Sequence, residues 1–250
     1  IKRKNGEYYL HLTYEFEVCG RELKWNEFVA GERIAGIDVN VDRYAVSIAS
    51  ADGNFIESRI FYCHEMEYVS SHRRDNIAGE KAKEIIDYLL EQNVGSIVME
   101  DIKNIQSHDT DKRINRITHQ FAVAKMQKAL KVRALKNGFK IKFVNPAYTS
   151  VIGRFKYSKP LGISVHEAAA YVIARRGIGF EDKVPKALMK TMLRTLRFHL
   201  VKTLGSLEES KEKTKKDNVF KKQLKSYLKT LKTFKSNHYW KNWNVVHKTL

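Results

Sequence analysis

The pattern of apolar and polar positions predicts alternating strands and helices. An apolar run through Arg33–Asn40 carries a carboxylate near its end, Asp38, and a second apolar run follows at Tyr44–Ser50. Turn residues at Ala51–Asn54 lead into a third run at Phe55–Tyr62. Short turns join strands that are antiparallel neighbours, so we expect a three-stranded meander.

Helical and strand patterns then alternate. We expect helices at 76–92 and 115–136, strands at 96–100 and 139–144, a loop over the site at 103–113, a linker at 147–163, and a helix at 164–175 with Ser164 as its N-cap. A helical crossover makes the fourth strand parallel to the first. This order is that of the ribonuclease H fold, an α/β fold with a mixed five-stranded sheet and flanking helices.

The two ends of the chain have different patterns. Glu7–Val18 alternates like a strand after a turn at Lys4–Gly6, and Glu22–Glu32 is a polar connector. Because the chain begins at Ile1 inside a strand pattern, we expect a further N-terminal portion. Apolar positions at 186–204 and 220–234 predict a basic helical hairpin docked on the core. We therefore expect the end of an N-terminal β module at 1–32, the ribonuclease H-like domain at 33–180 and a helical extension at 181–250.

Charge is distributed unevenly. The formal net charge is +18, and residues 183–250 hold 18 Lys and Arg against 4 Asp and Glu. Such a basic region favours a phosphate-rich partner such as nucleic acid over a merely lysine-rich surface. Trp240 and Trp243 either stack bases there or pack the end of the chain down.

The cysteines and the apolar runs bound the cellular setting. Cys19 and Cys63 lack CxxC spacing, so we expect reduced packing residues and no structural zinc. No apolar run approaches membrane-spanning length, and no signal peptide is visible. We expect a cytoplasmic protein of a prokaryote with no membrane partner.

Three acids are candidates for one metal site. Asp38 and Glu100 both end apolar strands, and neighbouring strands would direct them to one point. Glu167, in the first turn of the last core helix, is the candidate third acid, or simply an acid favoured at a helix N-terminus. Carboxylate oxygens are ligands for Mg²⁺, and two ions about 4 Å apart can support phosphodiester hydrolysis.

Four sequence blocks together resemble the TnpB (OrfB) family, transposon-encoded relatives of type V CRISPR effectors with RuvC-like nuclease domains. The blocks are Gly36-Ile37-Asp38, Val98-Met99-Glu100-Asp101, Asn145-Pro146-Ala147-Tyr148-Thr149-Ser150 and Glu167-Ala168-Ala169. The resemblance covers about Gly6 to Gly179. It implies an RNA-guided DNA endonuclease that uses Mg²⁺ (or Mn²⁺ in its place), with DNA and guide RNA as partners within transposon or CRISPR-like machinery. Asp38 and Glu100 match the first two catalytic acids.

The chain also departs from this family. The zinc ribbon that usually follows the Tyr-Thr-Ser block is absent. Where the family has an aspartate just ahead of Asn-Ala-Ala, this chain has His166-Glu167, so His166 either assists Glu167 or replaces it as a ligand. Basic residues near the expected site either hold phosphates or form solvated surface: Arg73, Arg74, Lys112, Arg113 and Arg116.

Two other functions remain to be weighed. The first is a protein of the same fold that is guided to DNA by RNA and no longer cuts it, which the unusual third position and the missing ribbon favour. The second is an actin-like sugar kinase, because Gly-Ile-Asp before a hairpin also opens that fold. Such kinases need glycine-rich phosphate loops later in the chain, and this sequence has no such pair.

Overall fold

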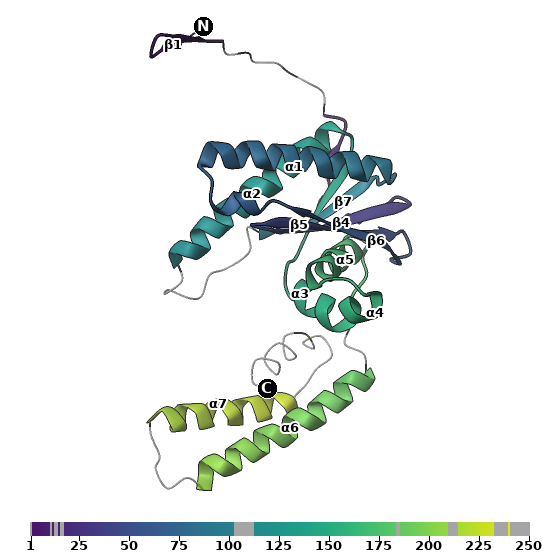
Figure 1. Ribbon diagram of the computed structural model, residues 1–250. Coiled ribbons are helices and arrows are strands. Elements are labelled where there is room, and N and C mark those ends of the chain that lie inside the picture. Colours follow the sequence, from purple (N-terminus) through teal and green to yellow (C-terminus); the bar gives the residue numbers. More distant parts are fainter. Residues whose placement is uncertain are drawn as a thin grey trace.

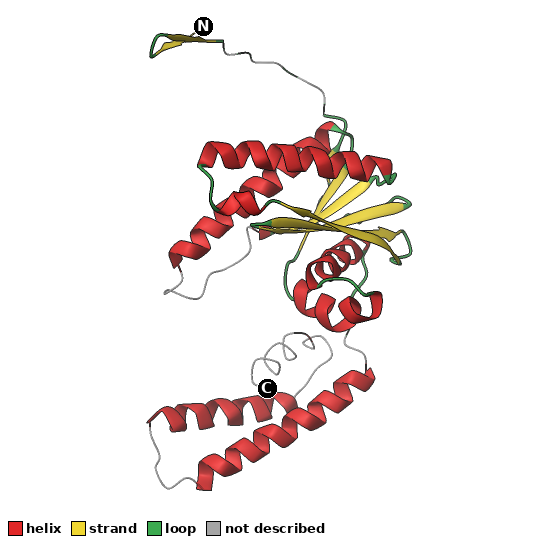
Figure 2. Ribbon diagram, viewed as in Figure 1, coloured by secondary structure: helices red, strands yellow, loops and turns green. Residues whose placement is uncertain are grey.

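A computed structural model describes residues 2–10, 12, 15, 18–102, 113–183, 186–209, 215–232 and 240. Within these residues a central sheet has six strands in the order β3-β8-β7-β4-β5-β6 (Figures 1 and 2). The strands span Arg21–Glu22 (β3), Arg33–Asn40 (β4), Arg43–Ser50 (β5), Phe55–Tyr62 (β6), Ser96–Glu100 (β7) and Lys140–Val144 (β8).

The strand directions confirm the predicted fold. Strands β4, β5 and β6 form the antiparallel meander, β7 pairs parallel with β4, and β8 pairs parallel with β7. This mixed sheet has ribonuclease H-like topology. One edge differs from the prediction, because Arg21–Glu22 pairs parallel with β8 as a sixth strand at the start of the stretch Glu22–Glu32, which we expected to be a connector.

Helices connect and cover the sheet. They span Ser71–Glu91 (α1), Arg113–Lys136 (α2), Thr149–Ile152 (α3), Lys159–Leu161 (α4), Val165–Ile178 (α5), Lys186–Glu209 (α6) and Lys215–Lys232 (α7). A short 3-10 helix, η1 (His64–Glu67), precedes α1, and a π-helical segment, η3 (Gly153–Ser158), joins α3 to α4. The stretch predicted as a linker at 147–163 is therefore largely helical.

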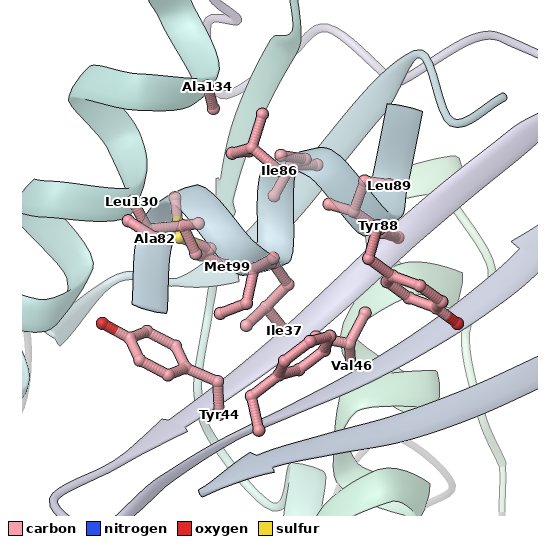
Figure 3. Close-up of a cluster of buried hydrophobic side chains, with 14 of the residues drawn as sticks. Ile37, Tyr44, Val46, Ala82, Ile86, Tyr88, Leu89, Met99, Leu130 and Ala134 are labelled. Atoms are coloured by element: carbon pink, nitrogen blue, oxygen red, sulfur yellow. The ribbon is translucent and has the colours of Figure 1, made fainter. Parts of the chain in front are cut away.

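The two faces of the sheet bury different helices. Helices α1 and α2 cover one face, and α5 covers the other (Figure 1). The larger core lies under α1 and α2, where Ile37, Val46 and Met99 pack against Ile86 and Leu89 (Figure 3). Because side chains alternate along a strand, the neighbours of these residues point to the α5 face. Asp38 and Glu100 therefore lie on the α5 side.

Helix α5 approaches the sheet closely at one glycine. A Cβ atom on Gly36 would lie 2.0 Å from the carbonyl oxygen of Ala170 and 2.4 Å from the amide nitrogen of Ala174. The alanines of α5 are buried against this face. Small residues on both elements thus let the helix backbone lie directly on β4, which brings the first turn of α5 next to the end of that strand.

The N-terminal residues form a separate hairpin. Strands β1 (Lys2–Lys4) and β2 (Glu7–Tyr9) pair antiparallel around the predicted turn. The strand predicted to reach Val18 ends at Tyr9, and the side chains of Tyr8, Leu10 and Leu12 are exposed. For the described residues beyond Tyr9, alternation of apolar and polar side chains without burial does not extend the strand.

The C-terminal helices pair with each other. Leu200 and Leu224 are buried between α6 and α7, with Leu204 and Tyr227 packed beside them. The hairpin stands beyond α3 and α4 rather than against the sheet, contrary to the docking that we expected (Figure 1). Helix α6 also continues through Gly205 to Glu209.

The two cysteines and Trp240 bear on three of the sequence predictions. Cys63 is buried as expected, whereas Cys19 is exposed, and both are free thiols. The indole of Trp240 donates a hydrogen bond to the carbonyl oxygen of Asp182, which favours packing for this residue, while Trp243 lies outside the described residues. In the part of the chain described, no helix is both long and apolar enough to cross a membrane.

Candidate active site

Asp38 lies near the end of β4 and is almost fully buried, with 8% of its surface exposed. Its Oδ2 accepts a hydrogen bond from Asn40 Nδ2 at 3.0 Å. His166 Nδ1 lies 3.2 Å from the same oxygen. A buried carboxylate needs such polar or cationic partners, because removing its charge from water is costly.

Glu100 ends the neighbouring parallel strand. The register pairs Ile37 with Met99, so Asp38 and Glu100 follow in adjacent positions on one face of the sheet. Thr149 Oγ1 donates a hydrogen bond to Glu100 Oε1 at 2.6 Å. The structure thus brings together the two acids that the strand-end pattern predicted.

Burial and the neighbouring charges both act on the carboxyl group of Glu100. Burial, reinforced by the negative charge of Asp38, raises the pKa of Glu100 to about 7, although the hydrogen bond from Thr149 and the charge of Arg176 oppose this shift. Arg176 also donates hydrogen bonds to the carbonyl oxygens of Asn145 and Ala147, which fixes the loop ahead of Thr149. Burial is thus the main reason why Glu100 holds its proton more tightly than an exposed glutamate does.

Glu167 has different partners. Its carboxylate accepts a hydrogen bond from the backbone amide of Ser164 at 2.9 Å, and its own amide donates to Ser164 Oγ at 3.2 Å. These two bonds form a capping box at the start of α5. Its other carboxylate oxygen accepts from Ser58 Oγ at 2.8 Å, and these hydrogen bonds lower its pKa despite partial burial. The carboxylate is thus engaged in holding the helix start.

His166 is the residue of α5 that contacts Asp38. Its hydrogen bond with Asp38 raises its pKa, although partial burial opposes the shift. Asn40 Nδ2 also lies 3.2 Å from His166 Nδ1. A small polar cluster therefore consists of Asp38, Asn40 and His166, with Glu100 beside it.

The predicted basic residues lie in other places. Arg73 is exposed at the start of α1, on the opposite layer from Asp38, and its guanidinium is 3.8 Å from Glu65. Arg74 follows it on the same helix. Only the backbone is described for Arg113 and Arg116 in α2, and Lys112 lies outside the described residues. Phosphate binding by these five residues remains a prediction.

Sequence reasoning missed Asn40, Thr149 and Arg176. Asn40 had a signal, since it lies two residues after Asp38 and points to the same face of a strand. Thr149 is inside the Tyr-Thr-Ser block, which marked it as notable without giving it a role. Arg176 carried no signal, because its position depends on how α5 lies on the sheet.

The donor atoms at this edge are two carboxylates with an imidazole and an amide beside them. Among the described residues, no group of three or more His, Cys, Asp and Glu side chains is arranged to hold a metal ion. Asp38 and Glu100 nevertheless supply carboxylate oxygens, the ligands that Mg²⁺ prefers. Burial, and to a smaller extent the charge of Asp38, raises the pKa of Glu100, and a cation bound beside the pair would favour its ionised form. The chemistry of this pair fits Mg²⁺, with His166 and Asn40 within reach of Asp38.

Comparisons with known proteins give distant likenesses. No protein-family model matches the chain. Over 162 residues it is 27% identical to the uncharacterized protein SSO2105 of Saccharolobus solfataricus; the alignment covers 60% of this chain and 42% of that relative, so the chain spans less than half of the relative's length.

Solved structures with a similar arrangement include a RuvC from Thermus thermophilus in complex with a Holliday junction substrate. The TM-score is 0.42 at 13% identity, covering 58% of this chain and 90% of that one. A Cas12f1–sgRNA–target DNA complex gives a TM-score of 0.41 at 17% identity, covering 58% of this chain and 50% of that one. Likenesses at this level assign no activity to the chain.

Proposed function

We propose that this chain is the nuclease part of a TnpB-like, RNA-guided DNA endonuclease that hydrolyses phosphodiester bonds with Mg²⁺. The observation that carries the proposal is the pair formed by Asp38 and Glu100. Two acids end neighbouring parallel strands on one face, and they are close enough that one raises the pKa of the other. The four sequence blocks that contain or flank these acids add the resemblance to TnpB proteins.

Each residue of the site has a proposed role. Asp38, Glu100 and His166 are the residues that we expect to hold the metal, while Glu167 serves as the helix cap. Asn40 and Thr149 orient the two carboxylates through their hydrogen bonds. Bound Mg²⁺ would supply an activated water and stabilise the leaving oxygen.

The basic hairpin supports nucleic-acid partners, which we propose to be target DNA and a guide RNA. A groove of about 720 Å³ runs along α6 and combines cationic and apolar side chains. It is lined by Leu193, Arg194, Arg197, Phe198, Val201, Lys202 and Leu228. Guanidinium and ammonium groups are suited to binding phosphates, and an exposed aromatic ring beside them is suited to stacking on bases.

A second candidate function is RNA-guided DNA binding without cleavage. The observation in its favour is the third position, where the carboxylate of Glu167 is engaged in the capping box and a histidine contacts Asp38. Intact Asp38 and Glu100 argue against it, because a protein that no longer cuts has no need of a buried acid pair.

Incubating the purified chain with labelled single-stranded DNA in Mg²⁺, Mn²⁺ or EDTA tests the proposal. We expect metal-dependent cleavage that Asp38→Ala and His166→Ala abolish. Glu167→Gln should retain cleavage, because glutamine can also complete a capping box. An inactive Glu167→Gln variant with normal stability would instead assign Glu167 to the metal site. Salt-sensitive binding without cleavage would favour the binding protein.

A further inference from the structure

A second row of side chains lies on the sheet just beyond Asp38. The register pairs Asn40 with Arg43 across β4 and β5, and Arg43 with Tyr62 across β5 and β6. Directly paired residues share a face, and so do residues two apart along one strand. Asn40, Arg43 and Tyr62 therefore all lie on the face of Asp38. At about 4.8 Å per strand, Tyr62 lies about 10 Å across the sheet from Asn40.

The ring of Tyr62 has two close neighbours, His64 and Arg43. Its ring stacks on His64 with centroids 5.0 Å apart and an interplanar angle of 23°. The guanidinium carbon of Arg43 lies 5.5 Å from the centroid of the same ring. We refer to Arg43, Tyr62 and His64 together as the Tyr62 platform.

Asp42 anchors both flanks of this platform. Its carboxylate forms an ion pair with Arg43, in which Nε donates to Oδ1 at 2.9 Å. His64 Nδ1 lies 3.8 Å from Asp42 Oδ2. These contacts hold two flexible side chains in place, yet the platform stays accessible, with Tyr62 48% exposed and the His64 side chain 66% exposed.

The platform lies near the acid pair on the sheet, because Arg43 pairs across the strands with Asn40, two residues after Asp38. The platform and Asp38 thus lie on one face of the sheet, where β4 and β6 end and β5 begins.

We propose that the Tyr62 platform stacks an unpaired nucleobase of a single-stranded nucleic acid whose backbone passes the acids Asp38 and Glu100. Aromatic rings and guanidinium planes bind bases through their faces with little sequence preference. A phosphate is a poorer occupant, because the charge of Arg43 is already matched by Asp42. A duplex is also a poorer occupant, because its bases already stack on both faces. The inference rests on the proposed function only for the strand's passage beside the acids.

Fluorescence anisotropy in EDTA tests the platform without any cleavage. The full chain is titrated into a labelled oligothymidylate, its RNA counterpart, and an abasic polymer with the same number of phosphates. Tyr62→Ala should weaken binding of the two base-containing strands about tenfold and leave the abasic polymer unaffected. Tyr62→Phe should bind like the natural chain, because it keeps the ring face. Tyr68→Ala is the matched control, since Tyr68 is 84% exposed, directly follows η1 and lies outside this row.

A direct optical readout accompanies these titrations. A strand containing 2-aminopurine should lose fluorescence on binding to the natural chain and recover it with Tyr62→Ala. Equal losses of affinity on base-containing and abasic polymers would overturn the proposal, as would unchanged affinity or a chain that binds no oligonucleotide. Base-dependent binding in a chain that cuts nothing would support the platform while refuting the nuclease, so the two proposals fail separately.

Discussion

Replacing Glu100 with glutamine gives a quantitative test of the acid pair. Burial and the charge of Asp38 raise the pKa of Glu100 from 4.5 to about 7. Glutamine is neutral at every pH, and its side-chain oxygen can still accept the hydrogen bond from Thr149. The variant therefore resembles the protonated acid without its titration.

The pKa of Glu100 differs between the unfolded and the folded chain, and this difference sets the sign of the pH effect on stability. In the unfolded chain Glu100 ionises near its ordinary value, whereas in the folded protein it holds its proton up to about pH 7. Its contribution to the free energy of unfolding is thus fully present below the unfolded pKa and decreases as the pH rises towards the folded one. At 1.36 kcal/mol per pH unit, the decrease is about 3 kcal/mol.

Urea unfolding in EDTA measures this decrease. At about pH 5 the natural chain and Glu100→Gln should have similar free energies of unfolding, and at about pH 8 the variant should be more stable by about 3 kcal/mol. Taking the difference removes the groups that titrate in both proteins, including His166. Mg²⁺ at the higher pH should stabilise the natural chain more than the variant. A stability difference that does not change with pH would refute the reasoning.

Two further predictions concern the helix contact and the basic hairpin. Gly36→Ala should lower the free energy of unfolding by about 3 kcal/mol or more, because its Cβ would lie 2.0 Å from a backbone oxygen of α5. The control Gly79→Ala, in open space on α1, should raise the free energy of unfolding by about 0.5–1 kcal/mol. Similar urea midpoints for the two variants would contradict the close contact. Neutralising three groove cations should reduce the slope of log affinity for single-stranded DNA against log salt by about 2. The three groove cations are Arg194, Arg197 and Lys202. Neutralising the control set, the exposed Lys83, Lys140 and Lys159, should leave this slope unchanged.

The central sheet was predictable because its signals are local. Continuous apolar runs and turn residues mark β4, β5, β6 and β7, and their order fixes the topology. Strand β3 was not predictable, because Arg21–Glu22 is polar and exposed and becomes a strand only by pairing with β8. The stretch at 147–163 was also misjudged, since its helices lack a periodic pattern of their own and pack closely on α5. A Cβ atom on Gly153 would lie 2.7 Å from backbone atoms of Ala168 and Ala169.

The acids of the site were partly predictable for the same reason. Asp38 and Glu100 each follow an apolar run, and parallel neighbours end at the same edge of a sheet. The third residue of the site was harder to predict, because the two candidates, His166 and Glu167, are adjacent. Adjacent residues on a helix point about 100° apart, so only one of them can face Asp38. Which of them faces Asp38 depends on where α5 begins and how closely it lies on β4.

The sequence nevertheless contains a signal for that helix start. Ser164 followed three residues later by Glu167 is the capping-box pattern, which assigns the glutamate side chain to the backbone of the first turn. Once Glu167 is turned to the cap and to Ser58, its neighbour His166 is the first-turn residue that reaches Asp38. Gly36 and the alanines of α5 then set the depth of the contact. The chemistry that starts the helix thus decides which side chain stands at the acid pair, and a variant that moved the cap by one residue would replace the imidazole there with another group.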